Sequence, residues 1–227
     1  MRLTDWLPYF GPMLAFLAVL SAAEHAPPGL EAALLAARVL VPGLVFLYYF
    51  RAGAYPELRG FSPGGGVILD VLVGLSVAAV WVAPYLVWPE LRPGSEEAFN
   101  PNAAGAENRL LLIGLRLAGF ALVTPFIEEL FVRSFLIRLV EVIRDEEPDF
   151  RRIPIGHFAW SGFLFTVGWF TFTHTEWEWP VAFMAGVIYN LWLYQRKHIG
   201  SLILAHAVTN AALLFFVVSR EDLWFFL

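Results

Sequence analysis

Two adjacent carboxylates and an arginine, Glu128, Glu129 and Arg133, lie in a stretch of this chain that is otherwise apolar. A charged side chain in the middle of a bilayer costs roughly 2.5 to 3.5 kcal/mol, so such residues need partners, water or a function. Glu129 and Arg133 are four residues apart on one helical face and can pair. Glu128 lies about 100° round the helix from Glu129, so it faces elsewhere and has no local partner.

Two later apolar stretches supply groups that Glu128 can face. Phe170 and His174 are four residues apart in one stretch, and His206 and Asn210 are four apart in the other, so each pair shares a helical face. Either pair alone is explained as well by an interhelical hydrogen bond that fixes packing. A glutamate, histidines and an asparagine together can position and deprotonate a water molecule. The three stretches therefore indicate a water-activating site.

These stretches belong to a chain with the composition of a polytopic membrane protein. Of its 227 residues, 59% are hydrophobic and 15% are charged, and its mean hydropathy is +0.64. The net charge of −5 argues against a nucleic-acid partner. The sequence contains no cysteine, which excludes disulfides and thiolate chemistry. The first apolar run has no small-residue cleavage pattern after it, so we expect a retained helix.

Apolar runs long enough to cross a bilayer recur along the chain. We expect an all-α membrane bundle that forms a single integral-membrane domain over residues 1–227, with a motif-bearing core at about 109–218. The expected helices are about 6–23, 30–50, 66–88, 109–143, 155–174, 180–194 and 199–218. A break or kink is expected at Pro125. The bundle then has seven transmembrane helices, or eight if Pro125 divides the fourth segment.

Basic residues favour one end of a seven-helix bundle by nine to three: Arg2, Arg51, Arg59, Arg138, Arg144, Arg151, Arg152, Arg196 and Lys197 against Arg92, Arg109 and Arg220. The positive-inside rule therefore puts the N-terminus in the cytoplasm.

The depth of His174 conflicts with this simple arrangement. At 1.5 Å per residue, Glu128 and His206 both lie about 14 to 15 Å from the basic end, whereas His174 would lie about 33 Å from Arg152. We therefore expect residues 149–158 to lie along the surface, the fifth helix to start later, and the cavity to open to the cytoplasm. The alternative is a split at Pro125.

Several other polar residues lie inside or near apolar helices. We expect Arg38, Asp70 and Arg116 to pair across the bundle, because buried charges need partners. Tyr189 and Asn190 lie in the middle of the sixth helix and can hydrogen-bond to the site, although helix packing explains them better.

The three motifs resemble those of the CAAX protease and bacteriocin-processing family, whose eukaryotic members are the type II prenyl-protein endopeptidases. That family is marked by E-E-x-x-x-R, F-x-x-x-H and H-x-x-x-N or D, in this order, on three membrane helices. Here the motifs occupy residues 128–133, 170–174 and 206–210. Ser134 stands where many relatives have glycine. The short chain is similar to the CAAX-protease-related group encoded beside exosortase-type sorting systems.

The resemblance implies an intramembrane endopeptidase of a bacterial inner or plasma membrane. Its substrate would be a membrane-associated protein or peptide, prenylated or not, cleaved near its C-terminus. Glu128 would be the general base on a water that His174 helps to hold. His206 and Asn210 would donate hydrogen bonds to the oxyanion. Glu129 and Arg133 would form a supporting buried pair.

Three alternatives use the same residues. Glu128, His174 and His206 make a two-histidine, one-carboxylate set that can hold Zn²⁺ with an open position, although the chain lacks H-E-x-x-H and we prefer a metal-independent mechanism. A non-catalytic scaffold or immunity-type partner can retain the fold, which the intact motifs disfavour. An ion-coupled carrier predicts inverted repeats, and the sequence shows none. No sequence feature indicates an oligomeric state.

Overall fold

The chain folds into α-helices joined by short turns and 3₁₀ segments, which confirms the all-α prediction. The structure is a computed structural model that describes residues 5–27, 29–59, 66–93, 99–145 and 149–220, and this part contains no strand. Arg2, one of the basic residues counted above, lies outside the described residues. The helices are α1 (Leu7–Glu24), α2 (Glu31–Arg51), α3 (Gly66–Val87), α4 (Arg109–Leu117), α5 (Thr124–Glu128), α6 (Ile137–Asp145), α7 (Trp160–Phe172), α8 (Trp179–Arg196) and α9 (Ile199–Val218).

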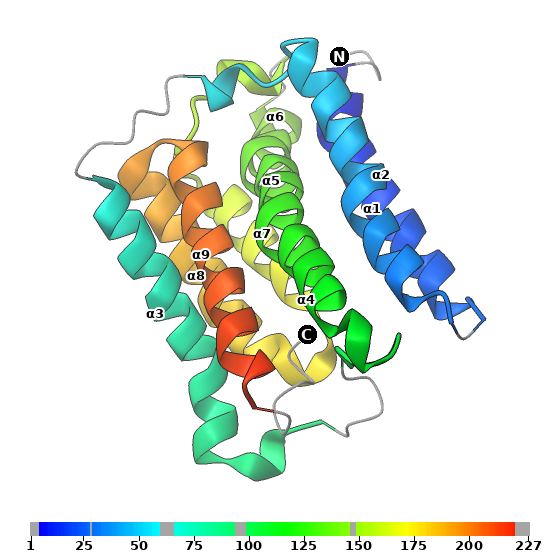
Figure 1. Ribbon diagram of the computed structural model, residues 1–227. Helices are drawn as coiled ribbons and strands as arrows, with labels where there is room; N and C mark the ends of the chain where they lie inside the picture. The colour runs from blue at the N-terminus through cyan, green and yellow to red at the C-terminus, as the bar shows by residue number, and fades with distance from the viewer. Residues whose placement is uncertain (1–4, 28, 60–65, 94–98, 146–148, 221–227) are drawn as a thin grey trace.

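Helices α4, α5 and α6 form one continuous helix, which we call the composite helix. Two π-helical segments, Ala118–Val123 and Glu129–Leu136, join its three parts. In Figure 1 the composite helix, in green, runs between α1 and α2 on one side and α3, α8 and α9 on the other. It therefore holds Glu128 in the interior of the bundle.

The expected break at Pro125 does not occur. Proline has no N–H to donate, and in π-helical spacing the carbonyl five residues earlier is that of Phe120. Asn210 of α9 donates from Nδ2 to this oxygen over 2.7 Å. A side chain from another helix thus satisfies a carbonyl next to the proline, and the helix continues without a break.

The predicted helix 155–174 starts later than its apolar run suggests, as the depth argument for His174 required. Residues Phe150–Arg152 form a 3₁₀ turn with Phe150 fully buried, and α7 begins only at Trp160. At 1.5 Å per residue its 13 residues span about 20 Å. His174, which follows α7, therefore remains within the bundle.

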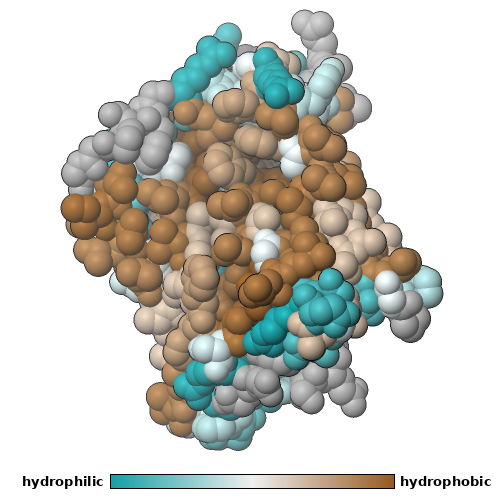
Figure 2. Space-filling model, in the orientation of Figure 1, coloured by the Kyte–Doolittle hydropathy of each residue, from teal (hydrophilic) through white to brown (hydrophobic). Residues whose placement is uncertain are grey.

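Among the residues that the structure describes, four helices have the length and apolar composition to cross a membrane: α2, α3, the composite helix over Ala106–Ile143, and α9. A shorter apolar stretch, Leu7–Ala23, lies in α1. Figure 2 shows apolar side chains over the middle of the visible face and polar ones towards its two ends. This distribution is that of an integral membrane protein; the count of seven or eight crossings stays a prediction.

Close packing of α3 against α9 fixes the position of the third motif along the axis of the bundle. A Cβ on Gly74 would lie 2.4 Å from the carbonyl oxygen of Ala205, so only glycine fits at this approach. Thr209 donates to the carbonyl oxygen of Gly74 over 2.8 Å. Ala205 and Thr209 lie on either side of His206 in the sequence, so their contacts with Gly74 hold the His206 side chain at a fixed depth in the bundle.

Asp70 of α3 pairs across the bundle as expected, but its partner is Arg196 of α8. The fully buried Asp70 carboxylate accepts from Arg196 Nε over 3.1 Å and from Trp192 Nε1 over 3.0 Å. The pair joins α3 to α8 and takes no part in the motif region.

Candidate active site

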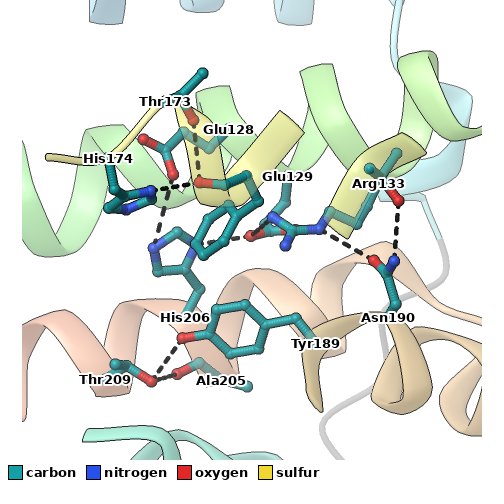
Figure 3. Close-up of polar contacts among 12 residues, drawn as sticks. Glu128, Glu129, Arg133, Thr173, His174, Tyr189, Asn190, Ala205, His206 and Thr209 are labelled. Atoms are coloured by element: carbon teal, nitrogen blue, oxygen red, sulfur yellow. Dashed lines mark hydrogen bonds and ion pairs between the residues drawn. The ribbon is translucent and has the colours of Figure 1, made fainter. Parts of the chain in front are cut away.

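All four residues predicted to act on substrate line one cavity of about 380 Å³. Glu128 comes from the composite helix, His174 from the end of α7, and His206 and Asn210 from α9. Figure 3 shows Glu128, His174 and His206 converging from their three helices. We call this space the main cavity.

The second carboxylate of the first motif is fully buried behind the cavity. Arg133 Nη1 donates to Glu129 Oε1 over 3.1 Å, and both side chains are 0% exposed, as expected for the i,i+4 pair. The same oxygen lies 2.7 Å from Nδ1 of His206, a contact that the sequence did not suggest. Because a carboxylate only accepts, His206 Nδ1 carries the proton of this hydrogen bond.

His206 consequently points its other nitrogen towards Glu128. Nε2 of His206 lies 3.9 Å from Glu128 Oε2, too far for a direct hydrogen bond and close enough for one shared water or substrate atom. The Glu128 side chain is 23% exposed, in contrast to the fully buried Glu129. The two neighbouring glutamates thus have separate surroundings, and only Glu128 is open to a substrate.

His174 is oriented by the helix that carries it. Its Nδ1 lies 2.6 Å from the carbonyl oxygen of Phe170, which can only accept, so Nδ1 carries a proton and Nε2 of the neutral ring is an acceptor. Trp179 Nε1 donates to the His174 carbonyl over 3.1 Å. The rings of Trp81 and Phe170 pack against the imidazole at centroid distances of 5.3 Å and 4.5 Å.

Asn210 lines the cavity, and one of its two amide N–H groups is already bonded within the protein. One N–H of its amide is taken by the Phe120 carbonyl. An asparagine amide has two N–H groups, so one donor is left for a ligand.

Tyr189 and Asn190 of α8 support the motif residues, although the sequence favoured helix packing for both. The Tyr189 ring packs at a tilt against the His206 ring, with 5.2 Å between centroids, and its hydroxyl donates to Thr209 over 2.8 Å. Asn190 Oδ1 accepts from Arg133 Nε over 3.4 Å. No spacing in the sequence links α8 to the motifs, because these contacts depend on which faces of separate helices meet.

The cavity lies towards the end of the bundle opposite the N-terminus. Pro93, which follows α3, and Thr175, Trp177 and Glu178, which follow α7, all contribute to its lining. In Figure 1 the α7–α8 turn and the end of α9 lie at the bottom, whereas the N-terminus lies at the top. The expectation that the cavity opens at the basic, N-terminal end is therefore wrong, because α7 ends and delivers His174 on the other side.

The alternative zinc set does not assemble in this structure. Within the described part of the chain, no group of three His, Cys, Asp or Glu side chains could hold a metal ion. Nδ1 of both His174 and His206 is engaged by the protein, and each ring keeps Nε2 as its remaining nitrogen. The zinc alternative stays a prediction.

Comparisons with known proteins place the motif region in a family. Residues 110–212 match the family model described as type II CAAX prenyl endopeptidase Rce1-like, and this range contains all three motifs. Searches of curated proteins and of solved structures each found no match. Residues 110–212 of this chain are therefore similar to the Rce1-like family of type II CAAX prenyl endopeptidases.

Proposed function

We propose that this protein is an intramembrane endopeptidase that hydrolyses a peptide bond near the C-terminus of a membrane-associated protein or peptide. The observation that carries the proposal is the convergence of Glu128, His174, His206 and Asn210 on one cavity. The match of residues 110–212 to an endopeptidase family model supports the same reaction class.

A water molecule between Glu128 and His174 is the nucleophile. Water has two protons to donate, and the two acceptors are the Glu128 carboxylate and Nε2 of His174, which is unprotonated because Nδ1 donates to Phe170. Glu128 takes one proton as the water oxygen attacks the substrate carbonyl carbon. His174 accepts the second hydrogen bond and directs the oxygen lone pair to that carbon.

His206 and Asn210 stabilise the oxyanion of the tetrahedral intermediate. Asn210 provides its remaining N–H, and His206 provides Nε2–H when its ring carries both protons. Glu129 accepts from Nδ1 of this ring, and Glu128 lies 3.9 Å from its Nε2. The intermediate then breaks its C–N bond, and the proton held by Glu128 passes to the leaving amine.

The reaction needs no metal ion in this arrangement. A general base, a water acceptor and two oxyanion donors are all provided by the side chains that line the cavity. Zinc at Glu128, His174 and His206 would occupy Nε2 of His174, which accepts from the water, and Nε2 of His206, which donates to the oxyanion. We therefore infer a glutamate-type mechanism.

Substrates reach the site from the extracytoplasmic side of the membrane. The excess of basic residues puts the N-terminus in the cytoplasm, and the cavity lies towards the opposite end. A prenyl group is not needed for such a substrate, because a transmembrane or surface-bound peptide already holds its C-terminus at this face.

A comparison of membrane-protein C-termini tests the proposed function. Cells that express the chain are compared with cells that express Glu128→Gln, which keeps the size and removes the base. Glu90→Gln is the matched control, since Glu90 is exposed and does not line the cavity. We expect truncated C-termini with the native chain and the control, and their loss in Glu128→Gln, His174→Ala and His206→Ala. Identical C-termini in all folded variants would leave a scaffold function instead.

A further inference from the structure

Arg133 lies at the centre of a buried polar network that reaches beyond the three motifs. Its Nη1 donates to Glu129, and its Nε donates to Oδ1 of Asn190 in α8 over 3.4 Å. Figure 3 shows the arginine between these two residues, with His206 beyond Glu129. Arg133 and Asn190 are both 0% exposed, and neither lines the main cavity. The network therefore acts on the site from behind.

The orientation of the Asn190 amide is determined by α7. Thr166 of that helix donates its only hydroxyl proton to the Gly162 carbonyl over 2.7 Å, so towards Asn190 its oxygen can only accept. Asn190 Nδ2 donates to this oxygen over 2.9 Å and to the Phe163 carbonyl over 3.4 Å. The NH₂ side of the amide must therefore face α7, and its oxygen must face Arg133.

Two aromatic rings also contact the Arg133 guanidinium. Its central carbon lies 4.4 Å from the Phe170 ring centroid and 5.6 Å from that of Tyr189. Phe170 packs against the imidazole of His174, and Tyr189 packs against that of His206. Contacts with ring faces attract the cation without selecting a direction for its N–H groups. That direction is therefore set by the hydrogen bonds at Nε and Nη1.

The direction of these N–H groups decides how Glu129 is held. Arg133 Nη1 and His206 Nδ1 donate to the same oxygen of Glu129, over 3.1 Å and 2.7 Å. The carboxylate cannot turn without losing one of the two donors. Because Nδ1 of His206 is fixed in this way, Nε2 of the ring faces Glu128 and the main cavity.

We propose that Asn190 and Thr166 are positioning residues for the oxyanion site. They set the direction of the Arg133 guanidinium, which fixes Glu129 and so orients the His206 ring towards the substrate. Neither residue belongs to the three motifs, so α7 and α8 contribute more to the reaction than His174 alone. The inference rests on the proposed function for its effect on cleavage and not for its effect on the imidazole.

NMR of the full chain labelled with ¹⁵N-histidine, in phosphatidylcholine nanodiscs, tests the positioning without any substrate. The His206 signals are identified by their loss in His206→Ala. In the native chain we expect a proton on Nδ1 with the downfield resonance of a hydrogen bond to a carboxylate. Asn190→Leu, which has a similar volume and no polar atom, should shift this resonance or remove it by exchange with water. An unchanged resonance in folded Asn190→Leu overturns the proposal.

Cleavage kinetics separate positioning from substrate binding. The substrate is a fluorogenic peptide copied from a C-terminus that the native chain truncates. In Asn190→Leu we expect kcat to fall about ten- to a hundredfold, as for a displaced catalytic group, with KM changed by less than about twofold. In Thr166→Val the loss should be about two- to tenfold, the range of one hydrogen bond, because the Phe163 carbonyl still holds the amide. Thr166→Ser keeps the hydroxyl and should keep the native kcat.

Thr171→Val is the matched control. Thr171 is buried on the same helix and donates to the Val167 carbonyl over 2.8 Å, as Thr166 does to Gly162, but within the described part of the chain its hydroxyl makes no bond to α8. It should lower the melting temperature as much as Thr166→Val does, and it should leave kcat and the His206 resonance unchanged.

The two threonine variants also decide the matter if Asn190→Leu does not fold. An equal kcat in Thr166→Val and Thr171→Val overturns the proposal, because the role of Thr166 is then purely structural. A His206 resonance that shifts in Thr166→Val and not in Thr171→Val supports it. This shift without any cleavage by the native chain would refute the proposed function alone.

Discussion

Glu129 Oε1 accepts from two side chains at once, Arg133 at 3.1 Å and His206 at 2.7 Å. It therefore links the buried arginine to the imidazole that faces the cavity. Glu128, one residue earlier, lies on another face of the same helix, and its ion-pair contact with His206 is longer, at 3.9 Å. Adjacent residues of the same type thus serve two purposes, because one is enclosed by donors and the other is open to the cavity.

Substitution in the buried pair should therefore lower the stability of the fold, whereas substitution of Glu128 should remove the activity and leave the stability unchanged. Arg133→Ala leaves Glu129 buried without its cation, and breaking such a pair costs about 3 to 5 kcal/mol. Its melting temperature in detergent should fall sharply. Glu128→Gln should keep the native melting temperature and lose proteolysis. A fully stable Arg133→Ala protein would contradict the supporting role of the pair.

Removal of metal ions should leave the activity unchanged. The proposed mechanism uses Glu128 as base and both Nε2 atoms for the water and the oxyanion, so no step depends on a Lewis acid. We expect purified active protein to contain far less than one zinc per chain by mass spectrometry, and cleavage to continue after chelation. Stoichiometric zinc together with activity that a chelator abolishes and zinc restores would refute the glutamate-type mechanism.

At the scale of elements, the contact of α3 with α9 determines where His206 lies. Gly74 lets the two backbones approach, and Thr209 bonds to its carbonyl. The composite helix continues through Pro125 for a different reason: it has π-helical turns there, and Asn210 of α9 bonds to its Phe120 carbonyl. Both contacts therefore join α9 to a neighbouring helix, α3 in the first case and the composite helix in the second.

Gly74→Ala should disturb the third motif although it lies outside it. The added Cβ would meet the Ala205 carbonyl at 2.4 Å, so α9 must move, and overpacking of this kind typically costs about 1 to 3 kcal/mol. We expect a lower melting temperature and reduced cleavage. Gly114→Ala is the matched control, because no atom lies within 4 Å of its Cβ position, and it should be neutral or up to about 1 kcal/mol more stable. Equal effects of both substitutions would contradict the role of the α3–α9 contact.

At the scale of the whole molecule, the basic residues and the main cavity lie at opposite ends of the bundle. The basic residues gather at the N-terminal end, and the loops after α3 and α7 line the main cavity at the other. Under the positive-inside rule, the enzyme would process chain ends on the extracytoplasmic face.

Single-cysteine labelling should establish this orientation, since the native chain has no cysteine to interfere. Glu90→Cys lies near the cavity end and Arg59→Cys at the basic end, and both positions are exposed. A membrane-impermeant maleimide should label Glu90→Cys in intact cells and Arg59→Cys only after permeabilisation. The reverse pattern would mean that the cavity faces the cytoplasm.

The sequence alone was sufficient for the helical membrane class, the family resemblance and the three motifs. These follow from local properties: apolar run length, the spacing of residues on one helical face, and residue types that are costly in a bilayer. The i,i+4 pair of Glu129 and Arg133 was predictable for the same reason, since both partners lie on one turn of one helix.

Only the tertiary structure decided how the helices meet. The contact of His206 with Glu129 and the support from Tyr189 and Asn190 depend on the rotation and depth of separate helices. The same is true of the end at which the cavity lies, because that depends on where α7 starts and stops. Periodicity along one chain segment carries no information on these relations, which close packing between segments determines.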